Sequence, residues 1–200
     1  MCWRAAADKI QRAVVARLLL LALPALAAAC VPDSRHPLTS FDSGSIDADL
    51  YGSWYWNDDQ ESGYLHFGRE PESGKLLLLM VELNRDGELG ITEMQGHTSR
   101  LGDNRYLNLK FIPSQDGIDG YLLIKYEITP KGLGIAFMDP GVVERGIAAG
   151  EVAGRAEQSG EFAAIKLTAS PQGLQQYIRD NDKALFADVK FLSRLQLPGL

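Results

Sequence analysis

Three histidines are the first candidates for metal binding or acid–base catalysis: His36, His66 and His97. His97 follows Glu93 by four positions. On a strand, that spacing places the two side chains on one face but about 13 Å apart. Because a zinc site needs three or four convergent ligands, the sequence predicts no metal site, and we interpret the histidines as ordinary polar positions.

No catalytic motif is present either. The sequence has no Gly-x-Ser-x-Gly, and it has no cysteine after position 30 that could pair with a histidine. The glycines of segment 146–154 lack the lysine of a phosphate-binding loop. Acidic residues are plentiful, but no spacing marks a catalytic carboxylate pair. We therefore expect a non-catalytic protein with no cofactor.

Aromatic residues form the most informative group. They would either fill a core and close one end of a barrel, or line a cavity that stacks on an apolar ligand. The core interpretation is favoured, and under the other one the ligand-binding residues are Trp54, Trp56, Tyr64 and Phe67. The whole group is Tyr51, Trp54, Tyr55, Trp56, Tyr64 and Phe67.

The first thirty residues have the pattern of an export signal. Residues 1–17 carry four basic side chains against the single acid Asp8, and residues 18–29 are apolar except for Pro24. A basic start, a short apolar run and small residues at the exit are typical of a secretory signal peptide. The run is too short to cross a bilayer as a helix. The sequence therefore predicts a signal peptide over residues 1–29.

The exit of this signal, Leu26-Ala27-Ala28-Ala29-Cys30, resembles the lipobox of bacterial lipoproteins. In that family the cysteine is diacylated, with chains such as palmitate, and becomes the first residue after cleavage. The resemblance implies that Cys30 is lipidated and anchors the protein in a membrane. The family prefers leucine three positions before the cysteine, where this chain has Ala27. Val31 after the cysteine, in place of aspartate, implies the periplasmic face of the outer membrane.

A second interpretation uses the same residues. Ala27 and Ala29 also satisfy the exit of an ordinary signal peptide, which would release a soluble periplasmic or secreted protein with a free thiol. Cysteine usage favours the lipoprotein, because the chain has only Cys2 and Cys30. A single cysteine at the cleavage junction is explained by acylation, and several acyl chains give stable anchoring.

Composition limits the partners and the size of the domain. Without residues 1–30 the chain keeps 16 basic and 25 acidic residues, a net charge of −9. That balance argues against nucleic acid and against charge-driven binding to anionic lipid. The length fits one domain. We expect a lipidated, flexible tether over 30–49, a single β-rich domain over 50–195 and a tail over 196–200.

Short alternating segments separated by Gly, Pro, Asp and Asn predict an antiparallel meander. The apolar run 75–83 lacks alternation, so we expect its strand to be covered on both faces. The fold class is mainly β (α+β), with about eight strands in an up-and-down barrel or a sandwich. The strands predicted in this part of the chain are 50–56, 64–67, 75–83, 88–98, 105–112, 121–129 and 133–138.

Two short helices are predicted in the C-terminal third. Asp139-Pro140 and Ser170-Pro171 each combine an N-cap residue with proline at the first helical position. They start helices over 139–149 and 170–182. The segments around the second helix predict strands at 151–156, 162–169 and 188–195.

Gly52-Ser53-Trp54 at the start of the first strand is similar to the Gly-x-Trp of lipocalins. In that family the tryptophan closes the bottom of an eight-stranded barrel near an arginine, and the mouth binds an apolar ligand. The order of a Gly-x-Trp strand, a meander, a late helix and a final strand is also lipocalin-like. The helix at Pro140 is not part of that pattern. The chain also resembles uncharacterised proteobacterial envelope lipoproteins.

Two functions remain open at this point. The absence of any chemical motif favours a non-catalytic interaction or structural module that meets another envelope protein. The alternative is a lipocalin-like carrier that binds an apolar small molecule or lipid in its barrel. A cavity would support the carrier, whereas a large exposed apolar patch would support the interaction module.

Overall fold

The chain divides into two compact units, Met1–Cys30 and Val31–Leu200. The computed structural model describes residues 31–42, 46–58, 62–83, 87–114, 118–159 and 162–195, all in the second unit. The predicted signal peptide 1–29, Cys30 and the predicted tail 196–200 lie outside the described residues. The elements are β1 (Asp33–Ser34), η1 (Ala48–Leu50), β2 (Gly52–Asn57), β3 (Ser62–Arg69), β4 (Leu76–Leu83), β5 (Leu89–Leu101), β6 (Asn104–Phe111), β7 (Tyr121–Thr129), β8 (Gly132–Phe137), α2 (Pro140–Ala148), β9 (Gly154–Ser159), β10 (Phe162–Leu167), α3 (Pro171–Leu185) and β11 (Lys190–Arg194).

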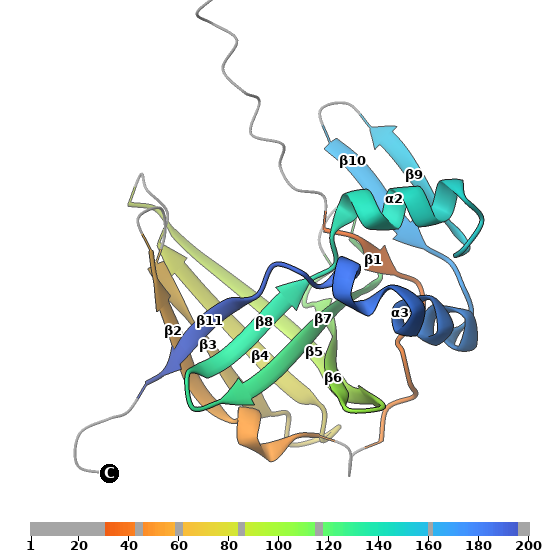
Figure 1. Ribbon diagram of the computed structural model, residues 1–200. Coiled ribbons are helices and arrows are strands. Elements are labelled where there is room, and N and C mark those ends of the chain that lie inside the picture. The colour runs from red at the N-terminus through yellow and green to blue at the C-terminus, as the bar shows by residue number, and fades with distance from the viewer. Residues whose placement is uncertain are drawn as a thin grey trace, which may run out of the picture. The chain divides into compact units, whose positions relative to one another are not determined.

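Eight strands close into an antiparallel barrel (Figure 1). Strands β2 to β7 each pair with the next strand along the chain, up to the β7–β8 pair. The last strand, β11, then pairs with both β8 and β2 and so completes the ring. The predicted fold class is confirmed, and the meander is a barrel rather than a sandwich.

Alternation along the strands separates the barrel interior from its outer face. In β6, Leu107 and Leu109 pack in the barrel core, whereas Tyr106 packs in a second core outside it. In β7, Ile124 and Tyr126 point inward, and Leu123 points outward. This period of two follows from the pleat of a strand. It gives the domain two apolar cores on either side of one sheet.

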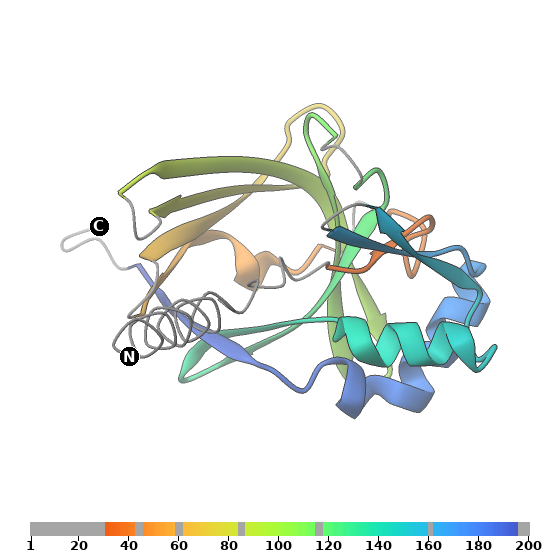
Figure 2. The ribbon, with the colours of Figure 1, turned by 90° about the horizontal axis from the view of Figure 1, so that it is seen from above.

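The second core lies between the barrel wall and a layer of helices. β1 pairs with β7 and with β10, and β10 pairs with β9, so these strands extend the sheet beyond the barrel. Helices α2 and α3 lie beside that extension (Figure 2). They contribute Val143, Leu174 and Ile178 to the second core. The barrel thus has one helix-covered side.

Both helices begin at the predicted caps. The Asp139 side chain accepts a hydrogen bond from the Val142 backbone N–H at 2.8 Å, and Ser170 Oγ accepts one from Gly173 at 3.2 Å. Proline follows each cap residue. These contacts satisfy N–H groups that a helix start otherwise leaves without partners. Helix α3 continues three residues beyond the predicted end at 182, to Leu185.

The predicted tether is partly integrated into the domain. Asp33 and Ser34 form β1, and Leu38 is fully buried. Asn108, on the outer face of β6, accepts a hydrogen bond from the Leu38 backbone N–H at 2.7 Å. Residues 31–42 therefore pack along the barrel rather than forming a flexible spacer, because their few apolar side chains and backbone groups find partners there.

The strand formed by the apolar run 75–83 also differs from expectation. Leu76 and Leu78 of β4 are buried in the barrel, but the outward Leu77, Leu79 and Val81 are only partly buried, and Leu83 is 44% exposed. The helices cover other strands. The predicted burial of this strand on both faces is therefore wrong.

Candidate functional site

An apolar cavity of about 530 Å³ lies inside the barrel. Side chains from all eight strands of the barrel contribute to its wall, and polar groups are few. A closed barrel of eight strands is just wide enough to be filled by side chains or to hold one small ligand. The lining residues are Trp56, Asn57, Asp58, Leu65, Phe67, Leu78, Met80, Glu82, Met94, Leu107, Ile124, Ile135, Phe137, Lys190, Phe191 and Leu192.

Strand register places the apolar lining side by side. Leu65 of β3 pairs with Met80 of β4, and Phe67 pairs with Leu78. Members of such a pair point to the same face. Gly63 leaves space for the Trp56 ring, because a Cβ there would lie 2.6 Å from Trp56 Cζ2. The wall is thus continuous from the buried Phe67 to the partly exposed Trp56.

One end of the cavity is open, and we call it the mouth. Strands β2, β4 and β8 end at this side, and β3, β5 and β11 begin there. The polar lining residues Asn57, Glu82 and Lys190 stand at these strand ends. Phe137, at the end of β8, is 43% exposed. An apolar wall with a few polar groups at its rim is typical of a small-molecule site.

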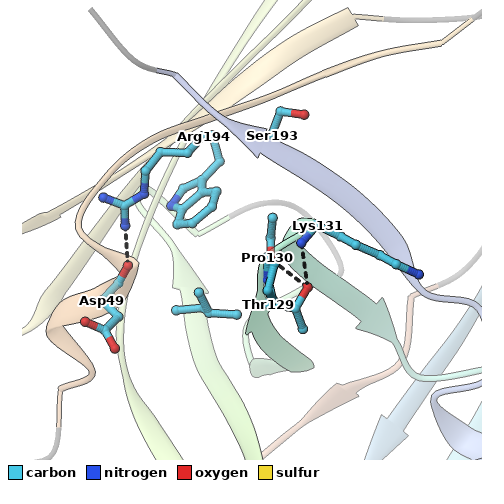
Figure 3. A pocket seen from close by; sticks show the side chains of 9 residues that line it. Asp49, Thr129, Pro130, Lys131, Ser193 and Arg194 are labelled. Atoms are coloured by element: carbon cyan, nitrogen blue, oxygen red, sulfur yellow. Dashed lines mark hydrogen bonds between the residues drawn. The ribbon is translucent and has the colours of Figure 1, made fainter.

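The opposite end is closed by η1 and Trp54. Trp54 is 2% exposed, and its Nε1–H donates to the Leu50 carbonyl oxygen at 2.8 Å. The Arg194 guanidinium lies over the Trp54 ring, 4.5 Å from its centroid, and donates to the Asp49 carbonyl oxygen at 2.5 Å (Figure 3). We call this the closed end.

A charged cluster at the closed end holds η1 in place. Asp47, the N-cap of η1, accepts hydrogen bonds from Arg105 at 2.9 Å and from the Tyr126 hydroxyl at 3.0 Å. Burial, followed by the negative charge of Asp47, raises the pKa of Tyr126 well above its usual range. Tyr126 therefore stays neutral and donates its hydrogen bond to Asp47. The cluster has a structural role, because it fixes the start of η1 to β6 and β7.

A polar hollow of about 570 Å³ lies outside this closed end. Asp49, Thr129 and Lys131 line part of it (Figure 3). The Thr129 hydroxyl accepts from the Lys131 backbone N–H at 3.2 Å and serves the β7–β8 turn. The polar groups that line this hollow thus stabilise the β7–β8 turn and η1. The apolar cavity is therefore the stronger candidate site.

The predicted ligand-binding residues occupy three different places. Trp56 and Phe67 line the cavity. Trp54 lies at the closed end and is not part of the lining. Tyr64 is on the outer face and 40% exposed, because it pairs with Tyr55 while its neighbour Leu65 points inward. The assignment of Tyr64 to the lining therefore disagrees with its position.

Sequence reasoning missed most of the aliphatic lining, including Leu78, Met80, Leu107 and Ile135. Leu107 was detectable, because alternation in its strand separates it from Asn108. Leu78 and Met80 carry no such signal, because their strand is apolar at almost every position. Only pairing with Phe67 and Leu65 fixes which face they share.

The histidines do not converge. His97 packs outside the barrel, and its Nε2–H donates to the Thr39 carbonyl oxygen at 2.8 Å. His66 lies on the outer face of β3, where Nδ1 is 2.9 Å from Ser53 Oγ. Among the residues that the structure describes, no three His, Cys, Asp or Glu side chains are placed to hold a metal ion.

Comparison with known proteins adds no relative. No protein-family model matches the chain, and no curated protein or solved structure is significantly similar to it. Within the described ranges, none of the helices has the length and apolar character that a membrane span requires.

Proposed function

We propose that this protein is a lipid-anchored carrier that binds an apolar small molecule or a single acyl chain in its barrel. The observation that carries the proposal is the apolar cavity of about 530 Å³, closed at one end and open at the other. Ligand pockets generally have volumes of roughly 300–1,000 Å³ and mainly apolar walls. Burial of an apolar ligand on such a wall supplies the binding free energy.

The lipocalin resemblance supports the same function. The predicted role of Trp54 matches its place at the closed end, and Arg194 supplies the arginine that the resemblance implies. The final strand closes the barrel, as in that family's order of elements. Helix α2 and the β9–β10 pair have no place in that pattern. We therefore propose a lipocalin-like binding mode with an added lateral layer.

The lipobox supports a location for this carrier. Acylation of Cys30 would hold the protein on the periplasmic face of the outer membrane. The alternative exit at Ala27 and Ala29 would give a soluble periplasmic or secreted protein. The barrel proposal holds for either location, because the cavity is built entirely from residues after Val31.

A second function, an interaction or structural module of the envelope, is favoured by one observation. Leu89 and Ile91 on the outer face of β5 are 63% and 65% exposed, beside the exposed Leu83 of β4. Exposed apolar patches often mark contact surfaces. The cavity is nevertheless the stronger indication of function. Exposed apolar side chains can occur on an outer face without a role in binding, whereas the enclosed cavity has the volume and the apolar wall of a ligand site.

The test begins with residues 31–200 isolated from the periplasm. Native mass spectrometry with organic extraction should find a retained apolar molecule, and a fluorescent fatty acid should bind to emptied protein. Met80→Trp fills the cavity and should weaken probe binding about tenfold or more. Val81→Trp, on the next and outward position of β4, is the matched control and should change affinity little.

Two results would reject the carrier. One is an empty wild-type protein that also fails to bind the probe. The other is equal weakening by Met80→Trp and Val81→Trp, which would place probe binding outside the cavity. Either result would leave the interaction module, to be pursued by crosslinking in the intact envelope.

A further inference from the structure

The outer face of the barrel carries a group of exposed apolar side chains beside the mouth. Register places Ile91, Val81, Tyr64 and Tyr55 in one row across β5, β4, β3 and β2. Leu83 and Leu89 form a pair nearer the strand ends. All but Val81 are at least 40% exposed. We call these six residues the mouth band: Tyr55, Tyr64, Val81, Leu83, Leu89 and Ile91.

The row next toward the closed end is mostly polar. It runs from Glu93 through Leu79 to His66 and Ser53. The mouth band is therefore two rows deep, about 7 Å along the strands. Apolar faces that lie in the interface of a bilayer are buried by roughly 5–10 Å. Tyrosines in the lower row and aliphatic side chains in the upper row match the order of a membrane interface.

The N-terminus of the described chain lies on the other side of the mouth. β1 runs antiparallel to β7 with Asp33 opposite Leu122, so the residues before Asp33 run toward Ile124. Ile124 pairs with Phe137, and both line the cavity. Val31 packs against the barrel core. The described chain therefore begins beside Phe137.

We propose that the mouth docks on a lipid bilayer, with the mouth band and Phe137 in the interface, so that the ligand passes directly between bilayer and cavity. The proposal deepens and rests on the carrier function. A bilayer is the occupant because the described chain begins beside the mouth at Val31, the residue that follows the predicted acylation site Cys30 in the sequence. If Cys30 is acylated, no linker separates the anchor from Val31, so the mouth would be held close to the membrane surface.

Charge is not the attractive force in this contact. The polar rim mixes the acidic Glu82 with the basic Lys190. Lys166 beside β1 forms an ion pair with Asp119, and Lys110 donates to the Asp119 carbonyl oxygen at 3.2 Å. Binding should therefore occur on uncharged membranes and should survive high salt, which screens exposed charges.

The test uses residues 31–200, a compact unit that contains every described contact and has no cysteine to acylate. Flotation with phosphatidylcholine vesicles should show binding that is unchanged in high salt. Leu89→Asn with Ile91→Asn should weaken it about tenfold or more, because two aliphatic side chains leave the interface. Leu195→Asn, at an exposed position that follows β11 on the closed-end side, is the control and should retain binding.

Tryptophan quenching by brominated phosphatidylcholine tests the orientation. Trp54→Phe leaves only Trp56, near the mouth, and Trp56→Phe leaves only Trp54, at the closed end. Quenching should be strong for Trp56 and weak for Trp54. Mouth docking would be overturned by absent vesicle binding, by equal loss in the double variant and in Leu195→Asn, by loss in salt, or by stronger quenching of Trp54. Binding to a protein partner alone would also overturn it.

Fatty-acid binding in vesicle-free solution separates this proposal from the carrier function. The double variant at Leu89 and Ile91 should bind the probe like wild type, because neither side chain lines the cavity. Probe binding without vesicle binding would reject only the docking. Loss of probe binding in wild type would reject the carrier itself.

Discussion

Arg194 and Trp54 close one end of the barrel together: the guanidinium carbon lies 4.5 Å from the indole centroid. The same guanidinium donates to the Asp49 carbonyl oxygen and so connects the last strand to η1. A cation over an aromatic ring is attracted by the ring's negative face. One side chain therefore joins the two ends of the barrel sequence.

Removing this arginine should destabilise the closed end. We expect Arg194→Ala to lower the free energy of unfolding by about 1–2 kcal/mol, through loss of the ring contact and one hydrogen bond. Arg155→Ala is the control, because Arg155 forms only an exposed ion pair with Glu157 on the same strand. Urea unfolding measures both, and equal small effects would contradict a closing role for Arg194.

Asn108 should be essential for fixing residues 35–42 to the barrel. It is fully buried, accepts from Leu38 and donates to Ser99 Oγ at 2.8 Å. We expect Asn108→Ala to cost about 2–3 kcal/mol, because these buried groups lose their partners. Faster tryptic cleavage after the exposed Arg35 should accompany the loss. Gln176→Ala, which removes exposed hydrogen bonds to the Asp180 carboxylate, should change neither measurement.

His97 should make the protein less stable in mild acid. Burial lowers the pKa of His97 below its usual 6.5, against the opposing effect of its bond to Thr39, and the charge of Lys75 acts in the same direction as burial. As pH falls below 6.5, the unfolded chain takes up a proton that the folded chain does not, so stability falls.

The variant His97→Gln isolates this effect. Wild type should lose up to about 1.4 kcal/mol more than the variant between pH 7.5 and 5.5, as one proton per molecule allows. Urea unfolding at the two pH values is the measurement, with His66→Gln as the control for loss of an exposed imidazole. A pH dependence unchanged by His97→Gln would assign the acid sensitivity to other groups.

Membrane retention should depend on Cys30. If Cys30 carries the acyl chains, Cys30→Ser should move the protein from the outer-membrane fraction to the soluble periplasmic fraction. Cys2→Ser, within the predicted signal, should leave retention unchanged. Fractionation followed by immunoblotting measures both, and a Cys30→Ser protein that still fractionates firmly with the outer membrane would disprove the anchor.

Local patterns were sufficient for most elements. Alternation located β6 and β7, and the cap residues Asp139 and Ser170 located the starts of α2 and α3. Local patterns were not sufficient where a segment was apolar at nearly every position or had very few apolar residues. The run 75–83 gave no face preference, and the polar segment 31–42 concealed the burial of Leu38, because burial depends on partners that lie far along the chain.

The sequence by itself determined the strands of the barrel, the helix caps, the acidic charge and the aromatic group near the first barrel strand. Only the tertiary structure decided that β11 pairs with both β2 and β8, which makes a barrel with an interior. That closure placed Trp56 and Phe67 on the cavity, Trp54 at the closed end and Tyr64 outside. The physical reason is that strand parity assigns residues to two faces, but only long-range pairing decides which face encloses a space.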